Sequence, residues 1–181
     1  MATTTNLTTK WFTVDNKEGV DFNFPQTISV TVNPELPAPR IALGELVHGN
    51  NGSRWMFVQA STTVTANNLV AIDVNFAANN LTSVLAASLK YTVGIAEFQA
   101  TVANAGDYFW ACLEARGGAA VNVINGQALS GTLLYVSSTQ AGAVTTSVSA
   151  AAVHGLYINS TITGTTATVD VVTVEPITTS A

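Results

Sequence analysis

The chain has 181 residues and a net charge of −5, with six Lys and Arg against eleven Asp and Glu. Charged residues make up 9% of the sequence, against about 25% in an average soluble protein. This length favours one domain with an arm over two full domains, and the acidic balance argues against binding of nucleic acid or anionic lipid, which needs clustered Lys and Arg.

Residues 1–40 are predicted to form an extended N-terminal arm that ends in a proline-rich linker. Pro34, Pro37 and Pro39 fix φ and remove backbone donors, so this stretch joins neither a central strand nor a helix. The N-terminus lacks a basic region followed by an apolar run, and every later apolar stretch is too short to cross a bilayer. We therefore expect neither a secretory signal nor a membrane segment.

Residues 41–174 carry short β-rich runs separated by Gly and Asn turns, which predicts an all-β domain, either a barrel or a sandwich. Residues 175–181 read as a C-terminal tail. One or two helical turns are expected near Leu81–Ser88. The expected strands are Trp11–Val14, Thr27–Val32, Leu43–His48, Arg54–Gln59, Leu69–Ile72, Tyr91–Gln99, Tyr108–Leu113, Ala119–Ile124, Thr132–Val136, Val153–Asn159 and Thr166–Val174.

Two local patterns are informative. "GNNG" at Gly49–Gly52 contains residues that tolerate positive φ, which predicts a hairpin between two strands. In "GDYFWACLEA" both faces of a strand would be apolar up to Glu114, which is typical of a central strand covered on two sides.

A faint internal repeat is present. "RWMFVQA", "NNLVAID" and "VGIAEF" run parallel to "DYFWACLEA", "GTLLYVS" and "HGLYIN", and they would form two similar β-halves packed together. From Gly117 to Val169 the chain has no charged residue. Such a surface repels copies of itself only weakly, so we expect much of it to be buried against other subunits.

Candidate catalytic residues are few. Cys112 would need His48 or His154 as a base, but no nucleophile motif surrounds it, and a buried, inert thiol is the better interpretation. These three residues are too far apart in sequence for a typical zinc site, so we expect no metal and no cofactor. Asp73, Glu97, Asp107 and Glu114 could supply a carboxylate pair for glycoside cleavage, yet no feature singles out a pair; a carbohydrate-active enzyme remains one alternative.

The stretch "LGELVHGNNGSRWMFVQASTTVTANNLVAID" resembles the head decoration, or capsid cement, proteins of tailed bacteriophages. The resemblance continues through "YTVGIAEFQATVANAGDYFWACLEARGGAAVNV" and "GTLLYVSSTQAGAV" to "VHGLYI", and covers roughly residues 41–174. Residues 1–40 match nothing in that family.

The resemblance implies a structural protein and not an enzyme. It implies β-rich subunits, a homotrimer, and the major capsid protein as partner, with the protein made in the host cytoplasm and located on the outer surface of the phage head. A tail fibre or receptor-binding module of the virion is the alternative, since such proteins are also β-rich trimers.

Aromatic side chains anchor interfaces, and the arm carries several of them. The same aromatics would serve equally well in a small core beneath the arm. The arm and linker positions predicted to bind a partner are Trp11, Phe12, Phe22, Phe24, Pro37 and Arg40.

Overall fold

The computed structural model describes residues 22–26, 41–49, 52–88, 90–124, 131–147, 151–158 and 166–179, with the backbone alone at 116–117 and 166–179. The all-β prediction is confirmed, because strands dominate these residues and the single described helix is short. The elements are β1 Leu46–His48, β2 Arg54–Ala60, β3 Val64–Thr65, β4 Leu69–Ile72, β5 Ala77–Asn80, α1 Ser83–Ala87, β6 Thr92–Ile95, β7 Val102–Ala103, β8 Tyr108–Ile124, β9 Leu133–Val136, β10 Val144–Thr145, β11 Ala152–Ile158 and β12 Thr166–Thr179.

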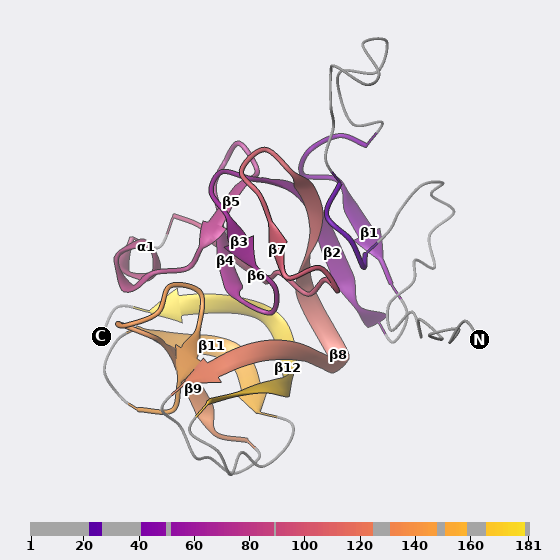
Figure 1. Cartoon of the computed structure of the whole chain (residues 1–181). Helices are drawn as coiled ribbons and strands as arrows, with labels where there is room; N and C mark the ends of the chain where they lie inside the picture. The colour runs from indigo at the N-terminus through magenta and orange to yellow at the C-terminus, as the bar shows by residue number, and fades with distance from the viewer. Residues whose placement is uncertain are drawn as a thin grey trace, which may run out of the picture.

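The strands close into two rings that share β8. The first ring runs β2–β5–β4–β6–β8 and returns from β8 to β2, and the second runs β8–β10–β9–β11–β12 and returns from β12 to β8. In Figure 1, β8 bends as it passes from the strands of the first ring to those of the second. Ring closure removes most of the exposed sheet edges that invite aggregation.

The two rings have the same topology. In each, the first strand pairs in parallel with the third strand of the unit, through Ala60↔Ala78 in the first ring and Val123↔Val144 in the second. All other ring pairings are antiparallel. The internal repeat in the sequence therefore has a structural counterpart: β4 and β6 correspond to β9 and β11, as the sequence predicted.

The first element of the repeat is shifted from its predicted place. The register of the parallel pairs equates Ala60 at the end of β2 with Val123 at the end of β8. The counterpart of β2 is therefore the last part of β8, and not the "DYFWACLEA" that begins it. Since β8 is 17 residues long, its first part serves as the last strand of the first ring and its second part as the first strand of the second.

Matching turns follow β4 and β9. After β4, the Asp73 carboxylate accepts the N–H groups of Asn75 and Ala77, at 2.8 and 2.9 Å. After β9, the Ser137 hydroxyl accepts the N–H groups of Thr139 and Gln140, at 3.1 and 3.0 Å. Both are side-chain-capped turns, and they place the following strand in the same antiparallel register, Ile72↔Ala78 and Val136↔Val144.

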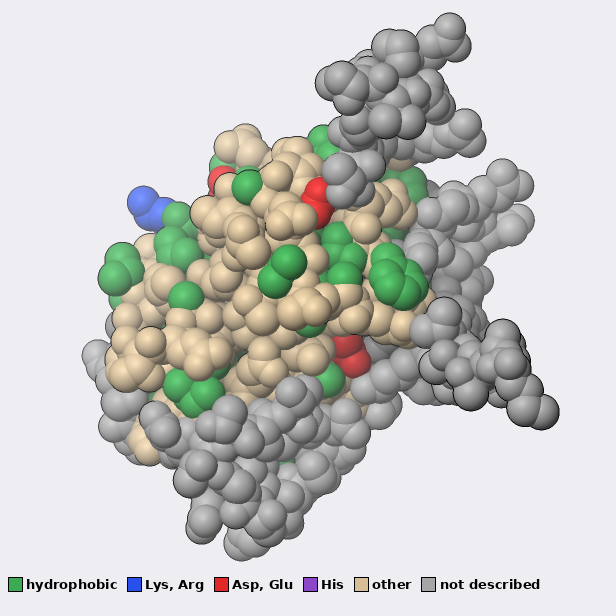
Figure 2. Space-filling model, viewed as in Figure 1, with side chains coloured by type: hydrophobic (Ala, Val, Ile, Leu, Met, Phe, Trp, Pro, Cys, Tyr) green, Lys and Arg blue, Asp and Glu red, His purple; other side chains and the backbone are tan. Residues whose placement is uncertain are grey.

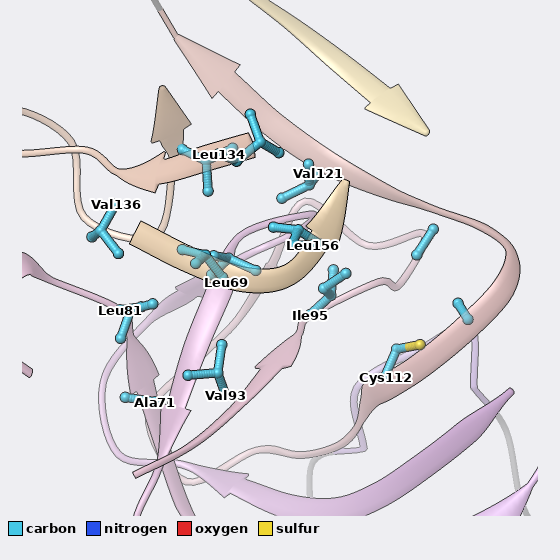
Figure 3. Close-up of a cluster of buried hydrophobic side chains, with 14 of the residues drawn as sticks. Leu69, Ala71, Leu81, Val93, Ile95, Cys112, Val121, Leu134, Val136 and Leu156 are labelled. Atoms are coloured by element: carbon cyan, nitrogen blue, oxygen red, sulfur yellow. The ribbon is translucent and has the colours of Figure 1, made fainter. Parts of the chain in front are cut away.

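Two hydrophobic layers fill the molecule. One lies inside the first ring and includes Val58, Val70 and Phe109. The other begins on the outer face of the first ring and continues into the second, so that Leu69 of β4 lies next to Leu156 of β11 (Figure 3). Strand β4 is buried on both faces because it separates these layers.

A buried amide network ties the rings together. Asn68, which is 2% exposed, donates from Nδ2 to Asn80 Oδ1 at 3.0 Å and to the Ala141 carbonyl at 3.1 Å. Its Oδ1 accepts from Asn122 Nδ2 at 2.8 Å. Gly142 passes so close that a Cβ there would lie 2.5 Å from the Asn68 amide nitrogen, and its φ of +79° also favours glycine.

Several boundaries differ from the expected ones. The two strands expected at Tyr108–Leu113 and Ala119–Ile124 are one strand, β8. Residues 175–179, expected in the tail, belong to β12. Strands β1 and β2, on either side of the predicted hairpin turn, pair in antiparallel register. Strands β3, β5, β7 and β10 were not predicted, and the strands expected at Trp11–Val14 and Thr27–Val32 lie outside the described residues.

Candidate interaction surface

Residues 22–26 lie against the first ring of their own chain. The Phe22 ring stacks on Trp55 with centroids 4.6 Å apart and meets Trp110 edge-on at 5.6 Å. Gln26 and Tyr108 exchange both backbone hydrogen bonds, at 2.6 and 2.8 Å, and the Gln99 N–H donates to the Asn23 carbonyl at 2.6 Å. Residues 22–26 therefore extend the sheet beside Tyr108 through one bridge, and the Phe22 ring covers Trp55 and Trp110.

The predicted partner-binding residues fall into three groups. Phe22 is 2% exposed and belongs to the core, as expected if a small core lies beneath the arm. Phe24 is 43% exposed and is accessible to a partner. Trp11, Phe12, Pro37 and Arg40 lie outside the described residues.

The candidate nucleophile is enclosed by the core. Cys112 on β8 is fully buried, and its thiol donates to the Glu114 carbonyl at 3.5 Å. His48 on β1 and His154 on β11 are both exposed. A buried thiol that already donates to a backbone carbonyl is poorly placed to attack a substrate from solvent.

We expect a maleimide reagent to leave Cys112 of the native protein unlabelled over an hour and to label it completely in 6 M guanidinium chloride, because burial denies the reagent access. Intact-mass measurement follows the labelling. Rapid modification of the native protein would contradict the buried position of this side chain.

Two of the candidate carboxylates cap turns. Asp73 caps the β4–β5 turn, and Asp107 accepts the Asn104 N–H at 2.7 Å in the turn before β8. Glu97 is buried, and Glu114 lies opposite Arg54 in the β2–β8 register, where opposite charges stabilise a strand pair. Within the described ranges, no group of three His, Cys, Asp or Glu side chains is arranged to hold a metal ion.

An apolar loop tip and a shallow cleft lie at the end of β4. Val74 in this tip is 84% exposed. Phe76 has a φ of +61°, which is rare for an aromatic residue, and its ring packs directly on Gly44, where any Cβ would clash. The tip contributes to a cleft of about 140 Å³ lined by Met56, Ile72, Asp73, Val74, Phe76, Lys90 and Thr92.

The described surface exposes several large hydrophobic side chains. Its exposed large hydrophobic side chains are Phe24, Leu46, Val74, Val84, Val102 and Tyr157. Few charged side chains appear on the face shown in Figure 2. None of the described helices could cross a membrane. No protein-family model matches the sequence, and no curated protein matches it.

Proposed function

We propose that the chain is a structural virion protein that binds the outer surface of an icosahedral phage head and stabilises it, as a homotrimer in contact with the major capsid protein. The observation that carries the proposal is the composition of the second ring. The last part of β8, all of β9, β10 and β11, and the start of β12 fall within the charge-free run from Gly117 to Val169. The sequence resemblance described above supports the same role.

A neutral surface suits this role for an energetic reason. Burying an ion at an interface carries a desolvation penalty that often exceeds its electrostatic gain, whereas hydroxyl, amide and apolar groups avoid that penalty. A protein that binds the assembled shell and not its separate subunits stabilises the shell by mass action, and many copies add their effects. The expected consequence is greater resistance of the head to heat and internal pressure.

Phe24 is the described arm residue that we assign to the head interface. Truncation of an aromatic interface anchor commonly costs more than about 1 kcal/mol, so Phe24→Ala is expected to weaken binding about tenfold. Co-sedimentation of the purified protein with heads that lack it measures the affinity. Val84→Ala on α1, a site that is 78% exposed, is the matched control and should bind like the wild type.

Equal affinities of Phe24→Ala and wild type would remove Phe24 from the interface, and no co-sedimentation of the wild type would overturn the function. Electron microscopy of virions with the protein gold-labelled distinguishes the alternative function. Label on the head supports a decoration protein, and label on the tail supports a fibre or receptor-binding module.

A further inference from the structure

Residues 22–26 occupy a well-defined site on the first ring. Their anchor is Phe22, whose ring is 2% exposed, and their register is set by Gln26, which exchanges two backbone hydrogen bonds with the first residue of β8. An aromatic anchor and main-chain hydrogen bonds are the features by which an extended segment recognises a sheet edge. The residues that receive the segment, here called the arm site, are Trp55, Gln99, Tyr108 and Trp110.

The chain that joins this segment to the first ring is much longer than the gap that it crosses. Gln26 pairs with Tyr108 at one edge of β8, and β2 pairs with the other edge. On the far side of β2, the Gly44 N–H donates to the Phe57 carbonyl at 2.8 Å. Three strand spacings of about 4.8 Å therefore separate Gln26 from Gly44, which is about 15 Å across the sheet. Residues 27–43, by contrast, can span about 55 Å when extended.

The sequence of this connection disfavours a tight return to the same chain. Residues 34–39 lie outside the described residues, but three of the six are proline. Such a run favours an extended conformation of about 3.1 Å per residue, or about 19 Å in total. The stiff run alone is thus longer than the gap between Gln26 and Gly44, so a connection within one chain must reverse its direction around it. A connection to a neighbouring copy needs no such reversal.

We propose that the arms are exchanged in the assembled protein, so that residues 22–26 of each copy occupy the arm site of a neighbouring copy. The exchange is reciprocal: each site is vacated by its own segment and filled by an identical one, with the same ring contacts and hydrogen bonds. Because no contact is lost, exchange of an identical element is a low-cost route to an oligomer. In a homotrimer the arms pass from each copy to the next around a closed ring. This inference rests on the self-association included in the proposed function and identifies the segment that mediates it.

Cysteines on separate chains test the exchange. Gln99 Nε2 donates to Asn23 Oδ1 at 3.3 Å in an exposed position, so Asn23→Cys and Gln99→Cys leave the core intact and place two thiols side by side. The native Cys112 is buried and does not compete.

The two single variants are co-expressed as separate chains and treated with oxidised glutathione. Exchange predicts disulfide-linked pairs of unlike chains, identified by intact mass under non-reducing conditions. They should exceed by about tenfold the level obtained with Val84→Cys in place of Asn23→Cys, because an exchanged arm holds the two thiols at a high effective concentration. Val84 is the matched control because its side chain is 78% exposed on α1.

Unlike pairs at the control level would overturn the inference, since each arm would then occupy its own chain, and so would a wild type that stays monomeric in sedimentation velocity. A chain that carries both substitutions gives a second readout. Exchange predicts linked species of two and three chains, whereas closure within each chain gives single chains with an internal disulfide. Head binding is measured separately by co-sedimentation, so a protein that binds heads without exchanging its arm overturns this inference and leaves the proposed function intact.

Discussion

Phe22→Ala is expected to lower the free energy of unfolding by about 3–5 kcal/mol, the usual cost of removing a buried phenylalanine ring. The ring fills the space between Trp55 and Trp110 and is 2% exposed. Its loss leaves a cavity at the outer face of β2 and β8, and it also removes the anchor that holds residues 22–26 against Tyr108 and Gln99. Urea denaturation followed by tryptophan fluorescence measures the change.

Phe24→Ala is the matched control, since it removes the same ring two residues away at a site that is 43% exposed. We expect it to cost less than about 1 kcal/mol, within the range of surface substitutions that leave buried contacts intact. Equal stability of the Phe22→Ala and wild-type proteins would show that residues 22–26 do not pack on the first ring of their own chain. The pair separates an anchoring role for Phe22 from a partner-binding role for Phe24.

Asn68→Ala is expected to destabilise the protein by about 3 kcal/mol or more. The substitution removes hydrogen bonds to Asn80, Ala141 and Asn122, and each buried polar group left unsatisfied costs about 1–3 kcal/mol. Because the network joins the residue that precedes β4 to the turn after β9 and to β8, its loss loosens the junction between the rings. Thermal and urea unfolding give the free energy.

Asn79→Ala is the control for this network. Asn79 lies beside Asn80 on β5, but its side chain makes an exposed hydrogen bond with Thr62 at 3.2 Å. We expect a loss of less than about 0.5 kcal/mol, as for most surface substitutions. If both variants lose the same small amount, the buried amides do not hold the junction.

Local patterns predicted most of the strands, but they divided β8 incorrectly. Glu114, Arg116 and the double glycine at 117–118 resemble a strand end. The strand nevertheless continues, because it changes partners at this point: Arg54↔Glu114 is the last pair with β2, and the pairs with β12 extend from Glu114 to Ile124. Partner exchange involves residues far apart in sequence, so no window around residue 116 could reveal it.

Pro176 lies within β12, inside the stretch 175–181 that was expected to form a tail. A proline is unusual in a central strand because it lacks an N–H. In the structure, β12 pairs with β11 on both sides of this position, through Leu156↔Thr173 and His154↔Ile177. The register shifts between these pairs, and the proline occupies the irregular part of the ladder, where no regular hydrogen bond is required.

The candidate site was less predictable than the fold. Aromatic composition marked Phe22 and Phe24 equally, and their different burial depends on where Trp55 and Trp110 lie in space.

The sequence by itself determined the all-β class, most strand positions, the buried character of Cys112 and the charge-free run from Gly117 to Val169, because these depend on residue type and on alternation over a few positions. Only the tertiary structure decided that β8 is shared by two rings and that Phe22 is enclosed. Each of these depends on contacts between residues that are far apart in the sequence. A pattern over a few neighbouring positions contains only one of the two partners and therefore cannot predict such a contact.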